Sequence, residues 1–276
     1  PGSHIFDKHV VARMISDGHI TKDHPWVTHE KRSTAIFRHM ATHLSLTSSE
    51  VDFVCNVINP TPDVPGWEFT IVNNLAHGID TDKLDYIARD NHSIDLKLNI
   101  DINKIVSQSR LVDGKWSFLA NAQDDIFNIY FVRYRLHRHI YNQPKIVSFD
   151  VLYRDIMIHS KELWADINHS FQTENVASFC RFTDSYIIHN GSHILVGRYM
   201  QRKSQFVRDC DYDYREKESE TNVGSPEKID LMINIRKQRS ELLIPFHDER
   251  GEVCSVKKSR LWSFLPQDES FQYTIY

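Results

Sequence analysis

The stretch GIDTDKLDYIARD at residues 78–90 decides the fold prediction. We predict a helix over residues 82–92, on which Asp82, Tyr86 and Asp90 fall at positions i, i+4 and i+8. Residues at that spacing share one face of a helix. Faced across a cleft by a second polar row, these two carboxylates and the phenol could hold a metal, a phosphate chain and a sugar. The structural alternative is a solvated stripe.

A second helix, predicted over residues 124–141, repeats the arrangement with Arg133, His137 and Tyr141. No Asp or Glu occurs from residue 126 to residue 149, which leaves a basic face in a chain of net charge −4. Arginine is preferred for bidentate phosphate contacts, so this face indicates a bound polyphosphate. The alternatives are a solvated stripe, a salt bridge between the two helices, or an acidic partner helix.

The remainder of the first 203 residues also reads as mostly helical. We predict helices over residues 29–44, 67–76, 146–164 and 174–189, the last ended by a left-handed stop at Asn190-Gly191. Thr47 and Glu50 form the pattern of a capping box. Residues 59–67 contain three prolines and predict a loop.

The pattern of apolar residues changes after residue 203, from helical spacing to partial alternation. Strands are predicted over residues 228–235, 241–247 and 271–276, with partial alternation over 205–214, a turn at 248–251 and a short helix at 259–265. The predicted fold is therefore mainly α, with a helical portion at residues 1–203 and a small α+β lobe at residues 204–276.

Composition narrows the class of protein. The 276 residues are 41% hydrophobic and 25% charged, which is ordinary for a soluble globular chain. A net charge of −4 gives no global attraction to nucleic acid or anionic membranes, and no run approaches 18 apolar residues. The four cysteines form no C-x-x-C pair and predict reduced thiols. We see no signal peptide and expect an intracellular protein, nuclear or cytoplasmic.

The run at residues 78–90 resembles the signature of the sterile-alpha-motif and HD-domain dNTP triphosphohydrolases. Residues 133–141, centred on Leu136-His137-Arg138, are similar to the second signature of that family. Residues 1–7 (PGSHIFD) resemble the segment after its metal-binding His-Asp pair, and residues 26–30 (WVTHE) its next catalytic segment. With weaker similarity at Thr183-Asp184 and residues 258–266, the resemblance spans nearly the whole chain. It implies a helical HD-domain core that lacks its first helices.

The resemblance also implies roles for individual residues. Asp7 and His29 match the pair that assists attack at the α-phosphate, and His4 matches a phosphate-side histidine. Asp82 matches the last metal ligand. The substrate contacts that carry over are Lys83 and Arg133 to the triphosphate, Tyr86 and Asp90 to the sugar, and His137 and Tyr141 near the phosphates and the nucleoside. Asn142 stands where the family has Gln.

The chain departs from the family at the metal site. An HD site needs an upstream His and a His-Asp pair besides its final Asp. No His-Asp dipeptide precedes Asp7, and His247-Asp248 is read as a coincidence in the C-terminal lobe. A divalent metal (Zn, Fe, Mg or Mn) is thus implied for the intact family site. We expect this chain alone, as an N-terminally truncated form, neither to bind it nor to turn over substrate.

The family's allosteric GTP or dNTP sites carry over only in part. Leu119 and Asn121 stand at two of its basic positions, whereas Lys104 and Lys258 keep basic character. Nucleotide-triggered assembly into a homodimer or tetramer is therefore not assumed. No membrane partner is expected.

We accordingly expect a fragment or truncated form of an enzyme that hydrolyses dNTPs such as dGTP to deoxynucleoside and triphosphate, and so controls dNTP pools. The alternative is a non-catalytic homologue that binds nucleotide or single-stranded nucleic acid, or regulates an active subunit. The site residues that survive favour the enzyme, since a long-inactive site should drift.

Overall fold

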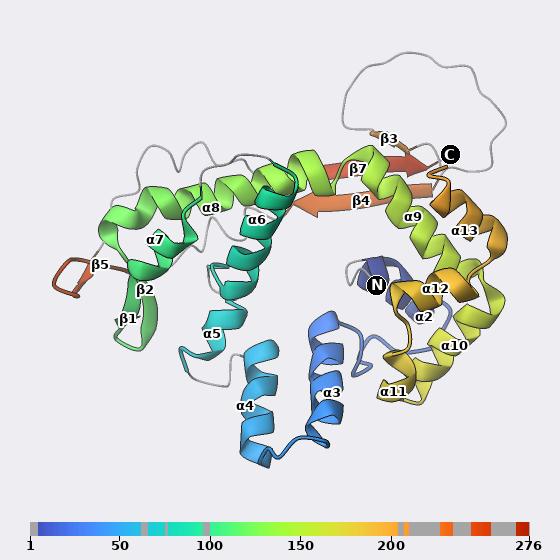
Figure 1. Ribbon diagram of the computed structural model, residues 1–276, viewed down its shortest axis with the longest axis horizontal. Coiled ribbons are helices and arrows are strands. Elements are labelled where there is room, and N and C mark those ends of the chain that lie inside the picture. The colour runs from blue at the N-terminus through green and yellow to red at the C-terminus, as the bar shows by residue number, and fades with distance from the viewer. Residues whose placement is uncertain are drawn as a thin grey trace. The chain divides into compact units, whose positions relative to one another are not determined.

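The computed structural model describes residues 5–61, 66–74, 77–95, 100–203, 207–209, 227–233, 244–254 and 269–275 (Figure 1). The chain divides into two units. Unit 1 comprises residues 1–55, 144–229 and 272–276, and unit 2 comprises residues 56–143 and 230–271. Residue 203 lies inside unit 1, and the division at that residue into a helical portion and an α+β lobe stays a prediction.

Unit 1 is built from helices. They are the π-helix η1 (Phe6–Val11), α2 (Ala12–Ser16), α3 (His29–Ala41), most of α4 (Ser48–Ile58), α9 (Pro144–His159), α10 (Lys161–Gln172), α11 (Val176–Phe179), α12 (Asp184–Asn190) and α13 (His193–Met200). Aromatic rings fill the core of this unit: the ring centroid of Phe171 lies 5.9 Å from that of Phe6 and 5.5 Å from that of Trp26. These contacts join the first helices of the chain to α10, far along the sequence.

Unit 2 combines helices with a sheet. Its helices are α5 (Phe69–Val72), α6 (Thr81–Ser93), α7 (Ile102–Ser107), the 3-10 helix η2 (Ala120–Ala122), α8 (Gln123–Leu136) and the π-helix η3 (His137–Tyr141). The sheet has the order β1-β2-β5-β6, from Ser109–Val112, Lys115–Leu119, Phe246–His247 and Val253–Cys254. Strand β2 runs antiparallel to β1 and parallel to β5. Ile79, Ile87, Phe118 and Ile126 are fully buried between α6, α8 and this sheet.

A second sheet has the order β3-β7-β4, from Val207–Asp209, Glu269–Ile275 and Glu227–Ile233. Strands β3 and β7 pair antiparallel, with Val207 opposite Ile275. These strands fall within or beside the predicted strand segments, except that residues 234–243, 255–268 and 276 lie outside the described residues, the predicted helix at 259–265 among them. The prediction of a mainly helical fold with a small α+β part is confirmed.

Several local predictions are confirmed. The capping box ahead of α4 is present, because the Thr47 N–H donates to the Glu50 carboxylate over 2.8 Å while the Glu50 N–H donates to the Thr47 hydroxyl over 3.3 Å. Helix α6 covers the predicted segment. The turn at 248–251 also forms, since the Gly251 N–H donates to the Asp248 carbonyl over 3.0 Å.

Two predicted long helices are wrong, because each is two helices. The helix predicted over 146–164 breaks at Ser160, whose backbone is extended and whose hydroxyl donates to the Ile156 carbonyl and accepts the Ser192 N–H. The helix predicted over 174–189 is interrupted before Thr183, which caps α12. The break at Ser160 is made by a contact with Ser192, a distant residue that periodicity does not reveal.

Three further predictions need correction. Gly191 does not adopt the left-handed conformation: its φ is −75°, and a Cβ there would lie 2.5 Å from a methyl carbon of Ile156, so close packing requires the glycine. The helix predicted over 67–76 shortens to α5, and the helix predicted over 29–44 ends at Ala41. The β1-β2 hairpin was not predicted, although Asp113 and Gly114 adopt the positive φ values, 49° and 71°, of a type I′ turn.

Among the described residues, no helix combines the length and the apolar character that crossing a membrane requires.

Candidate functional site

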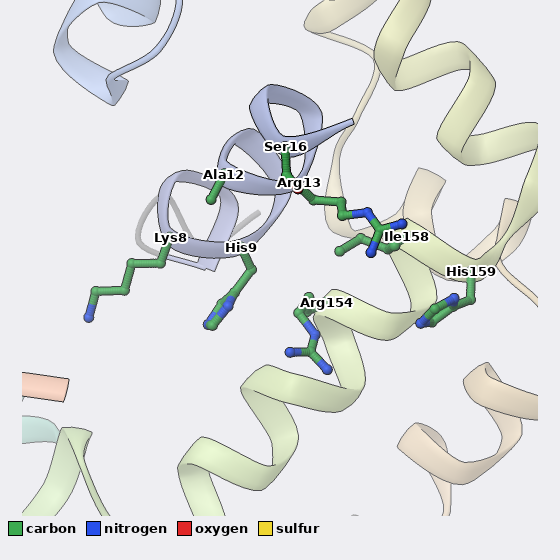
Figure 2. A pocket seen from close by; sticks show the side chains of 8 residues that line it. All are labelled: Lys8, His9, Ala12, Arg13, Ser16, Arg154, Ile158 and His159. Atoms are coloured by element: carbon green, nitrogen blue, oxygen red, sulfur yellow. The ribbon is translucent and has the colours of Figure 1, made fainter. Parts of the chain in front are cut away.

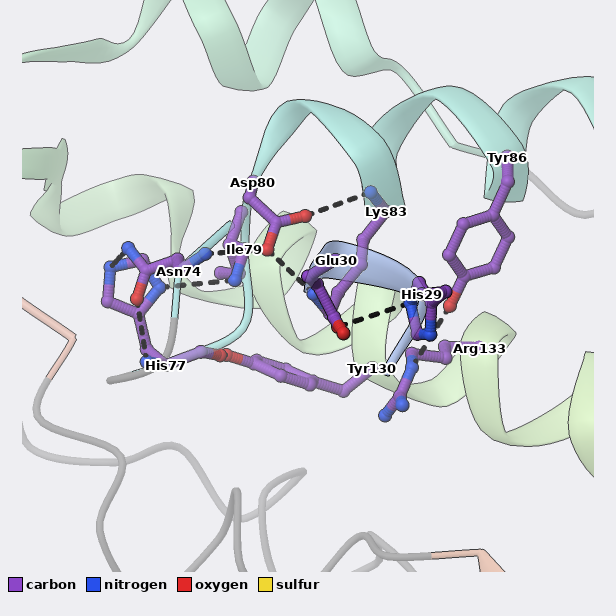
Figure 3. Close-up of polar contacts among 10 residues, drawn as sticks. All are labelled: His29, Glu30, Asn74, His77, Ile79, Asp80, Lys83, Tyr86, Tyr130 and Arg133. Atoms are coloured by element: carbon purple, nitrogen blue, oxygen red, sulfur yellow. Dashed lines mark hydrogen bonds and ion pairs between the residues drawn. The ribbon is translucent and has the colours of Figure 1, made fainter. Parts of the chain in front are cut away.

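Helix α6 begins on a buried carboxylate. Asp80 has no exposed surface, and its side chain accepts hydrogen bonds from the backbone N–H groups of Lys83 and Asn74, both over 2.9 Å. The Lys83 ammonium lies 2.6 Å from the same carboxylate (Figure 3). An aspartate at this position satisfies unpaired N–H groups of the first turn. Asp80 therefore fixes both the start of α6 and the position of the Lys83 ammonium.

The two predicted polar rows face each other within unit 2. Arg133 on α8 donates from Nε to the Tyr86 hydroxyl on α6 over 3.1 Å (Figure 3). Farther along, the Tyr141 hydroxyl donates to the Asp90 carboxylate. The His137 ring packs edge-on against Tyr141, with ring centroids 5.0 Å apart. The structure thus joins a guanidinium, an imidazole, two phenols and a carboxylate along the contact between the two helices.

Burial raises the pKa of both phenols. Desolvation raises the pKa of Tyr86, against the opposing effect of the Arg133 guanidinium. Desolvation, followed by the hydrogen bond to Asp90, also raises the pKa of Tyr141. Each phenol therefore keeps its proton at neutral pH and can donate it in a hydrogen bond. The π-helix η3 widens the turn that carries His137 and Tyr141, a feature that is frequent at functional sites.

The remaining predicted residues of unit 2 lie outside this contact. Asp82 is exposed on the first turn of α6. No group of three or more His, Cys, Asp or Glu side chains that could hold a metal ion occurs in the part of the chain that the structure describes. Asn142 ends η3 by donating its N–H to the His137 carbonyl. Lys104 pairs with Asp125 over 2.7 Å, and its allosteric role stays a prediction.

In unit 1 the structure brings together Asp7 and His29. The Asp7 carboxylate lies 2.7 Å from Nδ1 of His29 and accepts the His29 backbone N–H over 3.1 Å. The other ring nitrogen of His29 lies 3.1 Å from the Glu30 carboxylate (Figure 3). Both ring nitrogens can donate to a carboxylate when the imidazole is protonated, which suits a general acid. His4 and Lys258 lie outside the described residues.

Arg32 is a residue of this site that was not predicted from the sequence. It is 5% exposed, binds the second oxygen of the Asp7 carboxylate, and donates to the Trp26 carbonyl over 2.8 Å. Its guanidinium also lies over the Phe6 ring, 5.3 Å from the centroid. Its position one turn after His29 was the only indication in the sequence that Arg32 could contact the Asp7–His29 pair. That position does not distinguish a buried arginine from a surface arginine. Arg32 holds Asp7 in place for His29.

A buried histidine supports the start of α6 from the preceding loop. The Asn74 side-chain amide lies 3.0 Å from Nε2 of His77, and the Ile79 N–H donates to Nδ1 over 3.3 Å (Figure 3). Tyr130 donates its hydroxyl to the His77 carbonyl. Burial lowers the pKa of His77 to about 4. The imidazole is therefore neutral in the folded protein at physiological pH.

His77 predicts a loss of stability in acid. The folded protein keeps the imidazole neutral down to about pH 4, whereas the unfolded chain takes up a proton near pH 6.5. Because the unfolded state binds the proton first, the free energy of unfolding should fall over this window, by roughly 3 kcal/mol. Urea unfolding of the wild type and of His77→Gln at several pH values measures the difference, which isolates this group from other titrations. An identical pH slope in both proteins would contradict the prediction.

No family model matches the chain. Three relatives are similar to it over part of its length. A putative HD domain-containing protein of Acanthamoeba polyphaga mimivirus is 27% identical over 192 residues, 68% of this chain and 39% of the relative. The deoxynucleoside triphosphate triphosphohydrolase SAMHD1 homologue of Dictyostelium discoideum is 22% identical over 51% of this chain and 27% of its own length. Human deoxynucleoside triphosphate triphosphohydrolase SAMHD1 is 27% identical over 37% of this chain and 17% of its own length.

The chain thus matches well under half the length of these relatives. A solved structure of a phosphohydrolase from Bacteroides thetaiotaomicron superimposes with a TM-score of 0.71 at 14% sequence identity, covering 100% of this chain and 75% of that chain. The similarity in sequence to the named HD-domain and triphosphohydrolase proteins, together with this shared fold, confirms that the chain resembles the HD-domain dNTP triphosphohydrolases.

Proposed function

We propose that this chain is part of a phosphohydrolase that cleaves dNTPs to deoxynucleoside and triphosphate. The observation that carries the proposal is a pair of contacts made by α6: Tyr86 with Arg133 on α8, and Asp90 with Tyr141 on η3. These four residues lie in the two segments that resemble the family's signatures. The relatives named for triphosphohydrolase activity and the phosphohydrolase fold support the same reaction class.

The residues suit the parts of such a substrate. Arg133 offers a planar donor for phosphate oxygens. The neutral Tyr86 and Tyr141 phenols and the Asp90 carboxylate offer donors and an acceptor for a sugar. Lys83 can contact phosphate from its place beside Asp80 by using its remaining ammonium protons.

Asp7 and His29 supply proton handling. His29 can transfer its Nε2 proton, which in this structure faces Glu30, to the leaving oxygen, while Asp7 at Nδ1 fixes the orientation of the ring. Arg32 and the His29 N–H hold the Asp7 carboxylate in place.

The described residues do not fit a metal centre. Asp82 is exposed, and the nearby carboxylate of Asp80 is engaged by Lys83 and two backbone N–H groups. The part of the chain that the structure describes contains no set of three ligating side chains. The steps above accordingly use only the side chains of this chain.

Nucleotide titration tests the proposal. We expect dGTP to bind with a dissociation constant on the order of millimolar to high micromolar. Arg133→Ala should weaken that binding roughly tenfold or more, the loss typical of a charge-assisted hydrogen bond. Arg135→Ala, which removes the same charge two residues away on α8, is the matched control and should leave the affinity nearly unchanged. Tyr86→Ala should relax the preference for dGTP over GTP, because it opens the space proposed for the sugar.

The alternative function has a different signature in the same experiment. A nucleic-acid surface would bind a single-stranded oligonucleotide in preference to mononucleotides and would lose affinity steeply as salt increases. Titrations of dGTP, GTP and the oligonucleotide at two salt concentrations distinguish the two functions. Steeply salt-dependent oligonucleotide binding without saturable dGTP binding would replace the proposed enzyme by a non-catalytic regulator.

A further inference from the structure

A cavity lies wholly within unit 1, between the first helices and α9. Its volume is about 390 Å³, within the range of about 300–1,000 Å³ typical of small-molecule pockets. Figure 2 shows the side chains that flank it from the two sides. They are Lys8, His9, Ala12, Arg13 and Ser16 from η1 and α2, and Arg154, Ile158 and His159 from α9. None of them is a residue assigned above to substrate or proton transfer.

The lining of this cavity is cationic. Arg13 and Arg154 are permanently positive, Lys8 is a third cation when protonated, His9 and His159 add two imidazoles, and no carboxylate is among the lining residues. Lys8 from η1 and Ser16 from α2 line one side of the cavity, and Arg154 from α9 lines the other.

Neighbouring carboxylates orient the arginines from outside the cavity. Asp17 holds Arg13 over 2.7 Å, and Asp155 holds Arg154 over 2.7 Å. Arg154 is only 9% exposed, although burying a guanidinium is costly unless it is paired. Arg154 is thus a buried guanidinium, paired with Asp155, at the wall of the cavity.

Lys8 adds an independent indication. Desolvation lowers its pKa, and the Asp150 carboxylate opposes that effect only in part. Partial burial of Lys8 beside the cavity therefore disfavours its charged form. A bound anion would supply the missing charge and favour protonation of Lys8.

We propose that this cavity binds a triphosphate group, either as inorganic triphosphate or as the phosphate tail of a nucleotide. Several cations spread along two helices match a chain of phosphates better than a single phosphate. The apolar part of the lining is limited to Ala12 and Ile158, and the lining contains no Phe, Tyr or Trp on which a base could stack. Recognition is thus of the phosphate chain alone. The inference does not depend on the proposed function.

Calorimetric titration of the full chain with inorganic triphosphate tests the site. The Arg133→Ala variant serves as the background, so that phosphate binding at the proposed substrate site is weakened in every measurement. In this background, Arg13→Gln should reduce the affinity about tenfold, the effect of losing one charge-assisted hydrogen bond. Lys8→Gln should reduce it to a similar extent. Thermal unfolding checks that each variant remains folded.

Arg38→Gln is the matched control. Arg38 is as exposed as Arg13 (side chains 53% and 54%), each forms one ion pair with an aspartate, and Arg38 also belongs to unit 1. Its loss removes the same net charge but no lining residue. At about 0.15 M salt, where charges farther apart than roughly 8 Å are screened, it should leave triphosphate affinity nearly unchanged. Equal losses in Arg13→Gln and Arg38→Gln would overturn the site, because they indicate attraction by net charge.

Titrations with other ligands identify which molecule supplies the phosphates. Equal affinities for triphosphate and dGTP in the Arg133→Ala background would support recognition of the phosphate tail in either molecule. Tighter binding of inorganic triphosphate would support the free anion as ligand. An absence of triphosphate binding, or a preference for a single-stranded oligonucleotide, would overturn the proposal. Loss of dGTP binding with Arg133→Ala but not with Arg13→Gln concerns only the proposed substrate site, so the two proposals can fail separately.

Discussion

Replacing Asp80 by Ala is expected to lower the free energy of unfolding by roughly 3–5 kcal/mol, the range for removing one partner of a buried ion pair. The carboxylate is fully buried and accepts the backbone N–H groups of Lys83 and Asn74 as well as the Lys83 ammonium. Its removal leaves these donors without their acceptor and deprives α6 of its N-cap. The effect should appear in urea unfolding as a lower midpoint at a similar slope.

Asp85→Ala is the control for this prediction. Asp85 lies on the same helix and also forms an ion pair, with Arg89 over 3.2 Å, but its side chain is 69% exposed. Exposed pairs contribute about 0–1 kcal/mol, so the control should change stability little. Similar losses of unfolding free energy in the two variants would show that Asp80 contributes no more than an exposed charge on α6. That result would contradict the role of Asp80 in fixing the position of the Lys83 ammonium.

Asp7→Asn is expected to lower the rate of triphosphate release from a dNTP by about 10²–10⁴-fold, the usual contribution of general acid–base catalysis. This prediction rests on the proposed function. An amide in place of the carboxylate would turn a donor toward Arg32 or His29 and so misorient the ring that Asp7 now holds. The measurement is kcat for triphosphate release, made on the dNTP-hydrolysing protein of which this chain is proposed to be part.

The pair should also behave as one element. His29→Gln is expected to cause a comparable loss, and the double variant little further loss, because residues that act together are not additive. Asp52→Asn, which breaks the exposed pair with Arg38 in the same unit, should leave kcat nearly unchanged. Full additivity of Asp7→Asn and His29→Gln would contradict a shared role.

Local spacing predicts that Asp82, Tyr86 and Asp90 share one face of a helix, and that Arg133, His137 and Tyr141 share a face of another. The structure joins Tyr86 with Arg133 and Asp90 with Tyr141, whereas Asp82 is exposed and lies outside this contact. Spacing does not show which charges become buried. Asp80 lay within the stretch that decided the fold, yet its role as the N-cap depends on the loop before it folding back through Asn74.

Helix ends were predicted less well where distant residues determine them. The break at Ser160 requires the Ser192 N–H, and the glycine at 191 is required by Ile156 across the unit. Neither contact leaves a periodic pattern. The hairpin at Asp113-Gly114 was within reach of sequence reasoning, because this dipeptide is typical of a type I′ turn. Its two strands are short, and each gives too few alternating residues to be recognised between the neighbouring helical segments.

The division of the chain into interleaved units has a consequence for how the protein is made. The first 55 residues pack with residues 144–229, so unit 1 cannot complete its core until the whole intervening segment has been synthesised. During translation Phe6 and Trp26 must wait for Phe171 while their apolar surfaces face solvent or a chaperone. Such long-range closure slows folding. The yield of folded protein from an expression host should therefore increase at a lower growth temperature and with added chaperones. The increase should be larger than for a helical protein whose contacts are local.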